Sequence, residues 1–192
     1  MPVLPNYTEF AGRHWETGTL RNALAYQGIK APHTGKPISE ALLLGVSGGI
    51  TVGYFTFEYQ GYLPHLVLLT RNSFDPLDTV FERLAIGREI LQTTDANKAE
   101  TNLIEVLEGG RPALVWADMF TLPHNDLPYD ENNWGMIPVL VYGVEGDTVY
   151  LADRSNHPVK VNVDIFNQAR ARIKKDKFRV MVLDAPDMSK LP

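Results

Sequence analysis

The first half of the chain carries helical patterns and the second half carries strand patterns, and this order limits the folds available to it. Apolar residues recur at helical spacing in four segments, at residues 17–27, 40–44, 75–87 and 95–110. Strand-type segments rich in β-branched and aromatic residues follow at 111–120, 137–154 and 178–184. Helices followed by an antiparallel sheet predict an α+β fold, with N-terminal helices packed on a C-terminal sheet, and not a doubly wound parallel sheet.

Turn and capping residues divide these segments. Gly28 ends the first helix, and Ser39 is the expected N-cap of the second. Residues 50–70 read ITVGYFTFEYQGYLPHLVLLT, which predicts a hairpin or an extended pair. Glu145-Gly146-Asp147 is the expected turn of a second hairpin, and one more short helix is predicted over 163–174.

The length of 192 residues fits one domain, which we place at 1–185, followed by a tail or linker at 186–192. The formal net charge of −5 disfavours nucleic acid and anionic membranes as partners. The longest apolar runs fall short of the ~18 residues of a membrane span, and the first ten residues lack a secretory-signal pattern. The chain has no cysteine, which excludes disulfides, thiolate metal sites and thiol nucleophiles. We therefore expect a cytoplasmic protein.

Three short motifs could indicate other chemistry, and each has a simpler explanation. Residues 45–53, GVSGGITVG, lack the Lys-Ser/Thr of a phosphate loop, and a tight turn explains their glycines. Ser47 within them departs from the glycine spacing of a serine-hydrolase elbow. His124, Asp126 and Asp130 share one loop and could bind a metal, but loops of this composition are more often simply polar. We expect neither a metal nor a cofactor.

Two blocks of sequence, taken in order, resemble one family. The first is HWETGTLRNALAYQG followed by SEALLLGVSGGI, and the second, far along the chain, is IPVLVYGVEGDTVYLADR. Together they resemble the N-terminal domain of the butirosin biosynthesis protein H family, from His14 to about Arg172. The resemblance implies a papain-like cysteine-peptidase fold akin to that of bacteriocin-processing peptidases. It also implies acyltransferase activity, in which an aminoacyl group passes from a carrier-protein thioester to an aminoglycoside amine.

The family motifs imply a catalytic cysteine, histidine and aspartate, and this sequence keeps one of the three. The first motif reads His-Cys and then Thr; here His14 and Thr17 keep the frame, and Trp15 stands at the cysteine position. Counting back from the glycine of the second motif places the base position at Ile137. Asp153 matches the orienting acid. An indole cannot act as the nucleophile and an isoleucine side chain cannot carry a proton, so two of the three catalytic groups are missing.

These replacements predict a catalytically silent papain-like domain that binds a small molecule or a partner protein in the vestigial cleft. The resemblance implies a small amine or an acyl thioester as the ligand and a carrier protein as the partner. The predicted ligand-binding residues are His14, Trp15, Thr17, Asp118 and Asp153. Asp118 is included because it leads from a strand into a loop, where ligands are often bound.

The alternative is an acyltransferase that has no cysteine nucleophile. A base and an oxyanion hole can transfer an acyl group from a thioester directly to an amine that is held in place. In that case His14 or Asp153 is the expected base, and backbone N–H groups near Thr17 hold the oxyanion. Glu16 or Asp118 is then expected to orient the amine.

Overall fold

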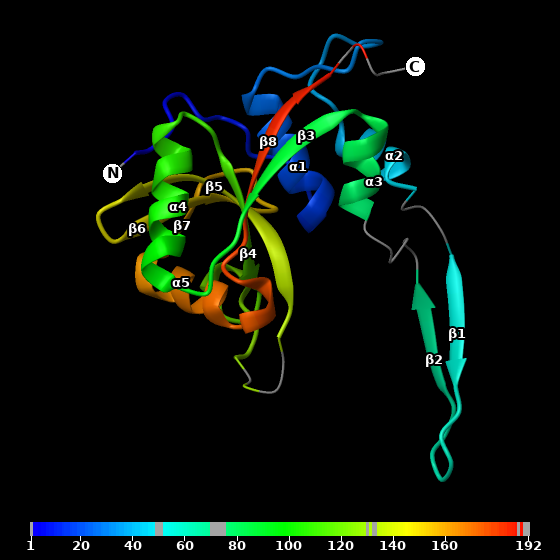
Figure 1. Cartoon of the computed structure of the whole chain (residues 1–192). Helices are drawn as coiled ribbons and strands as arrows, with labels where there is room; N and C mark the ends of the chain where they lie inside the picture. Colours follow the sequence, from blue (N-terminus) through cyan, green and yellow to red (C-terminus); the bar gives the residue numbers. More distant parts are fainter. Residues whose placement is uncertain are drawn as a thin grey trace.

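The computed structural model describes residues 2–48, 52–69, 76–129, 131, 134–187 and 189. Most of the strands form one six-stranded antiparallel sheet in the order β3-β8-β4-β5-β6-β7 (Figure 1). Its strands are β3 (Ile86–Leu91), β4 (Ala113–Asp118), β5 (Met136–Glu145), β6 (Thr148–Ala152), β7 (Val159–Asn162) and β8 (Val180–Pro186). A separate two-stranded sheet pairs β1 (Gly53–Phe57) with β2 (His65–Leu69).

Helices cover the six-stranded sheet. They are α1 (Trp15–Tyr26), α2 (Glu40–Val46), α3 (Pro76–Arg83), α4 (Ala96–Glu108) and α5 (Val163–Ala171), with 3-10 turns η1 (Pro123–Asn125) and η2 (Lys174–Asp176). α1 packs mainly on β5, whereas α5 and α4 contact β4. All residues of β4 are buried, so both faces of the sheet are covered at its centre. This arrangement confirms the predicted α+β class. Within the described ranges, no helix has the length and apolar character needed to cross a membrane.

α1 begins at Trp15, earlier than the predicted start at Thr17, because His14 acts as its N-cap. The apolar residues that predicted this helix lie in the core: Leu20, Ala23 and Leu24 are at most 1% exposed. Burial of this face against β5 stabilises the helix more than its intrinsic propensity does, since its sequence also includes Thr and Gly.

The two edge strands of the sheet, β3 and β7, were not predicted. The helix predicted over 75–87 ends at Arg83, and β3 begins at Ile86; residue 75 lies outside the described residues. Four of the six residues of β3 are exposed, so it lacks the apolar run by which a buried strand is recognised. β7 is only four residues long, with alternating burial. Edge strands bury little surface, and their signal in the sequence is correspondingly weak.

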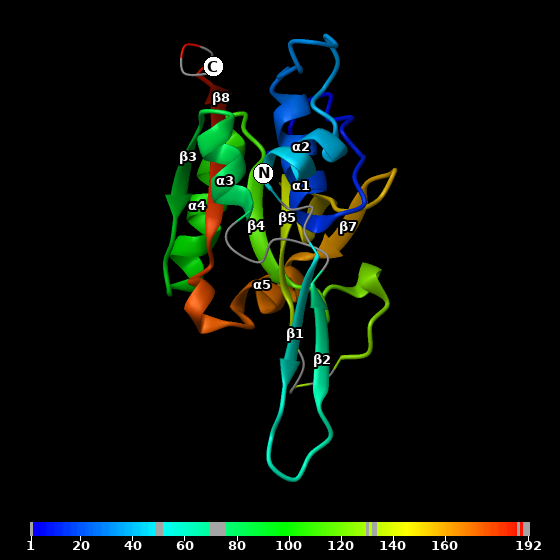
Figure 2. The ribbon, with the colours of Figure 1, turned by 90° about the vertical axis from the view of Figure 1, so that its right-hand side faces the viewer.

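The hairpin predicted within residues 50–70 is confirmed over 53–69. Residue 52 lies just before the first strand, and positions 50, 51 and 70 lie outside the described residues. Its turn is closed by a hydrogen bond of 3.1 Å from the Tyr62 N–H to the Tyr59 carbonyl, with Gly61 at φ +85°. The hairpin projects away from the six-stranded sheet, as two perpendicular views show (Figures 1 and 2).

The last strand of the sheet extends past residue 185, the predicted end of the domain. β8 continues through Pro186, and the N–H of Asp187 donates to the carbonyl of Ala85 at 2.9 Å. Residue 188 and residues 190–192 of the predicted tail lie outside the described residues. The beginning of the predicted tail therefore belongs to the last strand.

Candidate functional site

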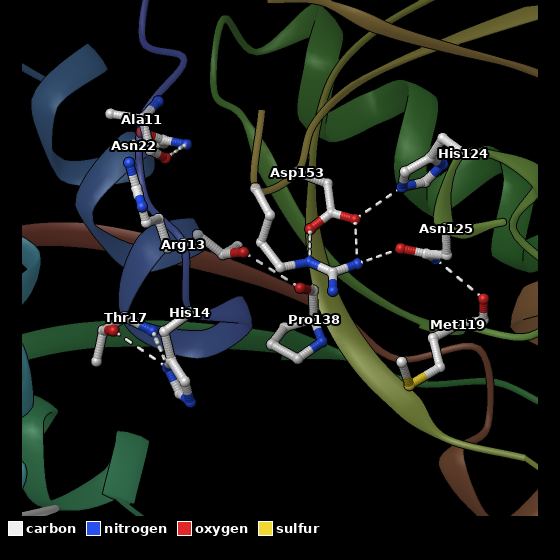
Figure 3. A network of polar contacts seen from close by, with 12 residues as sticks. Ala11, Arg13, His14, Thr17, Asn22, Met119, His124, Asn125, Pro138 and Asp153 are labelled. Atoms are coloured by element: carbon white, nitrogen blue, oxygen red, sulfur yellow. Dashed lines mark hydrogen bonds and ion pairs between the residues drawn. The ribbon is translucent and has the colours of Figure 1, made fainter. Parts of the chain in front are cut away.

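The N-terminal turn of α1 lies against the start of β5 (Figure 3). Thr19 on α1 donates its hydroxyl to the carbonyl of Pro138 on β5 at 3.1 Å. Trp15 precedes Thr19 by four residues and so lies on the same side of the helix, toward the beginning of β5. The predicted nucleophile position thus lies on the helix that packs on the strand carrying the predicted base position.

The end of β6 reaches the same region. Leu140 on β5 pairs with Ala152 on β6, and this antiparallel register places Asp153 beside Val139. Figure 3 shows Asp153, Pro138 and His14 within one close view. Positions 15, 137 and 153, which are far apart in the sequence, lie on α1, on β5 and directly after β6, and β5 contacts both α1 and β6.

A carboxylate closes the N-terminal end of α1. His14 accepts the N–H of Thr17 on its Nδ1 at 3.4 Å. Glu40, the first residue of α2, accepts the backbone N–H of His14 at 2.6 Å and that of Arg13 at 3.0 and 3.1 Å. The Thr17 hydroxyl donates to the same carboxylate at 3.3 Å. Because a helix N-terminus attracts negative charge, Glu40 stabilises this end of α1 and also occupies it.

The loop before α1 is held tightly against the helix. Gly12 has φ +100°, and a Cβ at this position would lie 2.4 Å from the Cα of Gly18. Asn22 donates to the carbonyl of Ala11 at 2.8 Å and accepts its N–H at 3.2 Å. The close approach and the paired hydrogen bonds fix the backbone that presents its N–H groups to Glu40.

Trp15 and Ile137 fill the predicted nucleophile and base positions with apolar side chains. The Trp15 side chain is 36% exposed, and its ring lies 5.2 Å from that of His14, centroid to centroid. Ile137 is 3% exposed and pairs with Ala117 on β4. Neither side chain can attack a carbonyl or carry a proton.

Asp153 lies at the centre of a buried charged network (Figure 3). Arg154 donates to its two oxygens, from Nε at 2.8 Å and from Nη2 at 2.9 Å. The Nε2 of His124, which comes from η1, lies 2.7 Å from the carboxylate. Asn125 accepts from Arg154 and donates to the carbonyl of Met119 at 2.9 Å. The network ties the end of β6 to the loop that joins β4 to β5.

The partners of Asp153 keep its carboxyl group ionised. Burial acts to raise the pKa of Asp153, but the hydrogen bonds and charges of Arg154 and His124 outweigh burial and hold that pKa below its ordinary value. The hydrogen bond to Asp153 in turn raises the pKa of Arg154. The Nδ1 of His124 is buried and has no hydrogen-bond partner among the described residues. Within that part of the chain, His124 contacts the network through its Nε2.

Asp118, at the end of β4, is fully buried. Its oxygens accept the N–H and hydroxyl of Thr121, at 3.1 and 2.7 Å, and the N–H of Gly135 at 2.8 Å. The Nε of Arg172 lies 3.9 Å from the same carboxylate. These bonds fix both ends of the loop between β4 and β5. The ligand-binding role assigned to Asp118 stays a prediction.

The family model described as butirosin biosynthesis protein H, N-terminal, matches the sequence over residues 14–154, which include both sequence blocks. The chain belongs to this family. A solved structure described as that of a C39-like peptidase from Bacillus anthracis matches with a TM-score of 0.59 at 17% identity, over 97% of this chain and 100% of that chain. This similarity shows the fold and confirms the papain-like architecture. No curated protein matches the sequence.

The family motif located Asp153, but sequence reasoning did not find the residues that hold it. His124 was considered only as a metal ligand, together with Asp126 and Asp130; Asp130 lies outside the described residues. No group of three or more metal-binding side chains occurs in the part of the chain that the structure describes. Arg154 directly follows Asp153, and this neighbouring opposite charge was the available signal.

Glu40 was also missed as a residue of the site. Ser39 was correctly predicted as the N-cap of α2, and it accepts the N–H of Leu42. An acidic residue directly after an N-cap is explained by the dipole of its own helix. Nothing in the local pattern reveals that the Glu40 side chain reaches across to α1.

Proposed function

We propose that this chain is a catalytically silent papain-like domain that binds a small molecule or a partner protein at the start of α1. The main support is the bond of 2.6 Å from the His14 N–H to the Glu40 carboxylate. Cysteine enzymes use such a helix end to lower the pKa of a thiol and to hold an oxyanion. Because Glu40 already places a negative charge there, a second anion beside it is repelled.

The residues at the reactive positions support the same proposal. An acyl-enzyme route needs both a nucleophile and a base, and the loss of either one removes most of the rate. Trp15 and Ile137 supply neither group, and the buried Ile137 side chain leaves no polar surface at its position. Asp153 alone cannot replace them, since its oxygens are engaged by Arg154 and His124.

The proposed ligand is a small amine or an acyl thioester, with a carrier protein as the partner that presents the thioester. The partly exposed indole of Trp15 offers apolar surface for an acyl group. The next residue, Glu16, lines a cavity of about 240 Å³ together with Trp116 and Arg179. The Arg179 guanidinium lies 3.8 Å over the Trp116 ring, and this cation supplies hydrogen-bond donors for the carbonyl of an acyl group.

The alternative, direct acyl transfer without a cysteine, has one observation in its favour. The His124–Asp153 contact of 2.7 Å pairs an imidazole with the acid of the family motif, although the histidine comes from a different loop. A histidine oriented by a carboxylate is the usual form of a general base. His124 is therefore the residue to test for this alternative.

A turnover assay distinguishes the silent binding domain from the acyltransferase. An acyl thioester of N-acetylcysteamine is incubated with an aminoglycoside-type amine, and thiol release is followed with a thiol reagent; the chain has no cysteine and gives no background. We expect wild-type protein to show no rate above the uncatalysed reaction. Turnover that is lost in His124→Gln and Asp153→Asn, but kept in the control variant Glu108→Gln at the exposed end of α4, would overturn the silent-domain proposal and establish the enzyme.

Binding is tested with the same compounds by calorimetric titration. We expect saturable binding that weakens at least ~10-fold, or 1.4 kcal/mol, in Trp15→Ala. Ile90→Ala removes another exposed apolar side chain, on the edge strand β3 outside the site, and should leave the affinity unchanged. Equal affinities of wild-type protein and Trp15→Ala would remove Trp15 from the proposed binding site.

A further inference from the structure

The β1–β2 hairpin exposes a large apolar surface that the described remainder of the chain does not cover. Large apolar side chains that are 45–85% exposed cluster on it, namely Val52, Tyr54, Phe55, Phe57, Tyr59, Tyr62, Leu63 and Leu66. The hairpin projects from the domain in both views (Figures 1 and 2). An isolated two-stranded hairpin is at best marginally stable in water. Its ordering therefore calls for a partner surface.

Both faces of the hairpin are apolar. Side chains alternate along a strand, so Phe55 and Phe57 lie on one face of β1 and Tyr54 lies on the other. Leu66 is directly opposite Thr56 and so shares the face of Tyr54. A hairpin made to cover its own domain needs one apolar face only. Two apolar faces indicate contact with something outside the domain.

The area is enough for a stable interface. Five of the exposed side chains are aromatic, and at ~200 Å² for each ring their exposed parts amount to roughly 600 Å². The exposed parts of Val52, Leu63 and Leu66 bring the surface to about the 800 Å² that each partner contributes to a standard interface.

The charge of the hairpin indicates what covers it. Between residues 52 and 69 the only acidic or basic side chains are Glu58 and His65, with no lysine or arginine. An acidic carrier protein or an anionic membrane would be met by basic residues, which this segment lacks. Permanent homodimer interfaces are the more apolar class and need no such charges. An uncharged apolar surface is complementary to a second copy of itself.

We propose that the β1–β2 hairpin is a dimerisation arm, through which two copies of this chain associate about a two-fold axis. In a two-fold contact the same patch meets itself, so each arm packs its aromatic side chains on the other. β1 and β2 form a sheet of two strands within the described residues, so their outer edges can also pair with the partner arm. This inference does not depend on the proposed ligand or on catalytic silence.

Sedimentation of the full chain tests whether the β1–β2 hairpin mediates dimerisation. The double variant Phe55→Glu, Leu66→Glu places one charge on each face, and we expect its dimer to dissociate at concentrations at least ~100-fold higher than the wild-type dimer. Trp134→Glu adds a charge at an exposed indole outside the arm and should leave the dimer intact. Circular dichroism should show that the helices and the six-stranded sheet are retained in all variants, since the altered side chains lie outside the core.

Cross-linking provides a second test that does not perturb the surface. The chain has no cysteine, so Thr56→Cys introduces a single thiol near the middle of the arm, and Thr34→Cys introduces one on an exposed loop. A short bismaleimide should yield covalent dimer with the first variant only. A wild-type monomer over the whole concentration range would overturn the proposal. A dimer indifferent to the arm variants would do the same, as would a monomer that binds phosphatidylcholine vesicles through the arm.

Discussion

The two sides of the candidate site hold their negative charges in different ways. On the helix side, the partly exposed Glu40 accepts backbone N–H groups in front of α1. On the sheet side, Asp153 is buried between the charged Arg154 and the ring of His124. The helix-side carboxylate accepts N–H groups at the start of α1, whereas the sheet-side carboxylate joins the end of β6 to the loop between β4 and β5. On the proposal of a silent site, the first excludes a second anion from the helix end and the second is retained for structural reasons.

The largest effect is expected at Asp153. Asp153 is buried, and Asp153→Asn removes the negative charge that pairs with the partly exposed Arg154, so we expect the free energy of unfolding to fall by about 3 kcal/mol. Asp118→Asn is the matched variant, because that carboxylate is equally buried but receives its short bonds from neutral donors. Its expected cost is smaller, about 1–2 kcal/mol. Urea unfolding measures both, and equal losses would remove the distinction between a carboxylate bonded directly to an arginine and one bonded to neutral donors with an arginine 3.9 Å away.

A smaller effect is expected on the helix side. Glu40→Gln keeps the shape but removes the charge in front of α1, and we expect a loss of about 1–2 kcal/mol because the group is partly exposed. Glu108→Gln, at the exposed end of α4, is the control and should change stability by less than ~0.5 kcal/mol. If Glu40→Gln matched this control, the carboxylate would contribute nothing to the helix end.

Acid should weaken the sheet side. The pKa of Asp153 is depressed in the folded protein, so its contribution is fully present above the unfolded value of ~3.9 and is lost as pH falls through the folded pKa. The difference in unfolding free energy between wild-type protein and Asp153→Asn should therefore shrink as pH falls below about 4. Chemical unfolding at a series of pH values measures this difference. A difference that stayed constant with pH would show that the carboxyl group does not titrate in this way.

Local sequence patterns predicted the helices and strands that bury a continuous apolar face. Contacts between residues far apart in the sequence could not be predicted from such patterns. The spacing of Leu20 and Leu24 predicted α1, because in a helix this spacing places both side chains on one buried side. β3 was missed because its exposed Arg88 and Glu89 interrupt any apolar pattern. The contact between His124 and Asp153 joins two loops, and no spacing along the chain encodes it.

The hairpin shows the same limit. Its β-branched and aromatic residues predicted paired strands, and the pairing is confirmed. Those residue types also form buried sheets, so the pattern gave no indication that Tyr54 and Phe55 would remain exposed. Whether a strand packs on its own core depends on the placement of the whole domain.

The proposal of a silent site depends on the chemistry of the α1 end, and the pKa of a thiol placed there measures it. Trp15→Cys creates the only cysteine of the chain, so its titration by iodoacetamide reactivity is free of other signals. We predict a pKa at or above the ordinary ~8.5, because Glu40 faces the same helix end, and a lower pKa once Glu40→Gln is added. A thiol pKa below ~7 with Glu40 intact would show that the helix end still stabilises an anion, and would contradict the proposal.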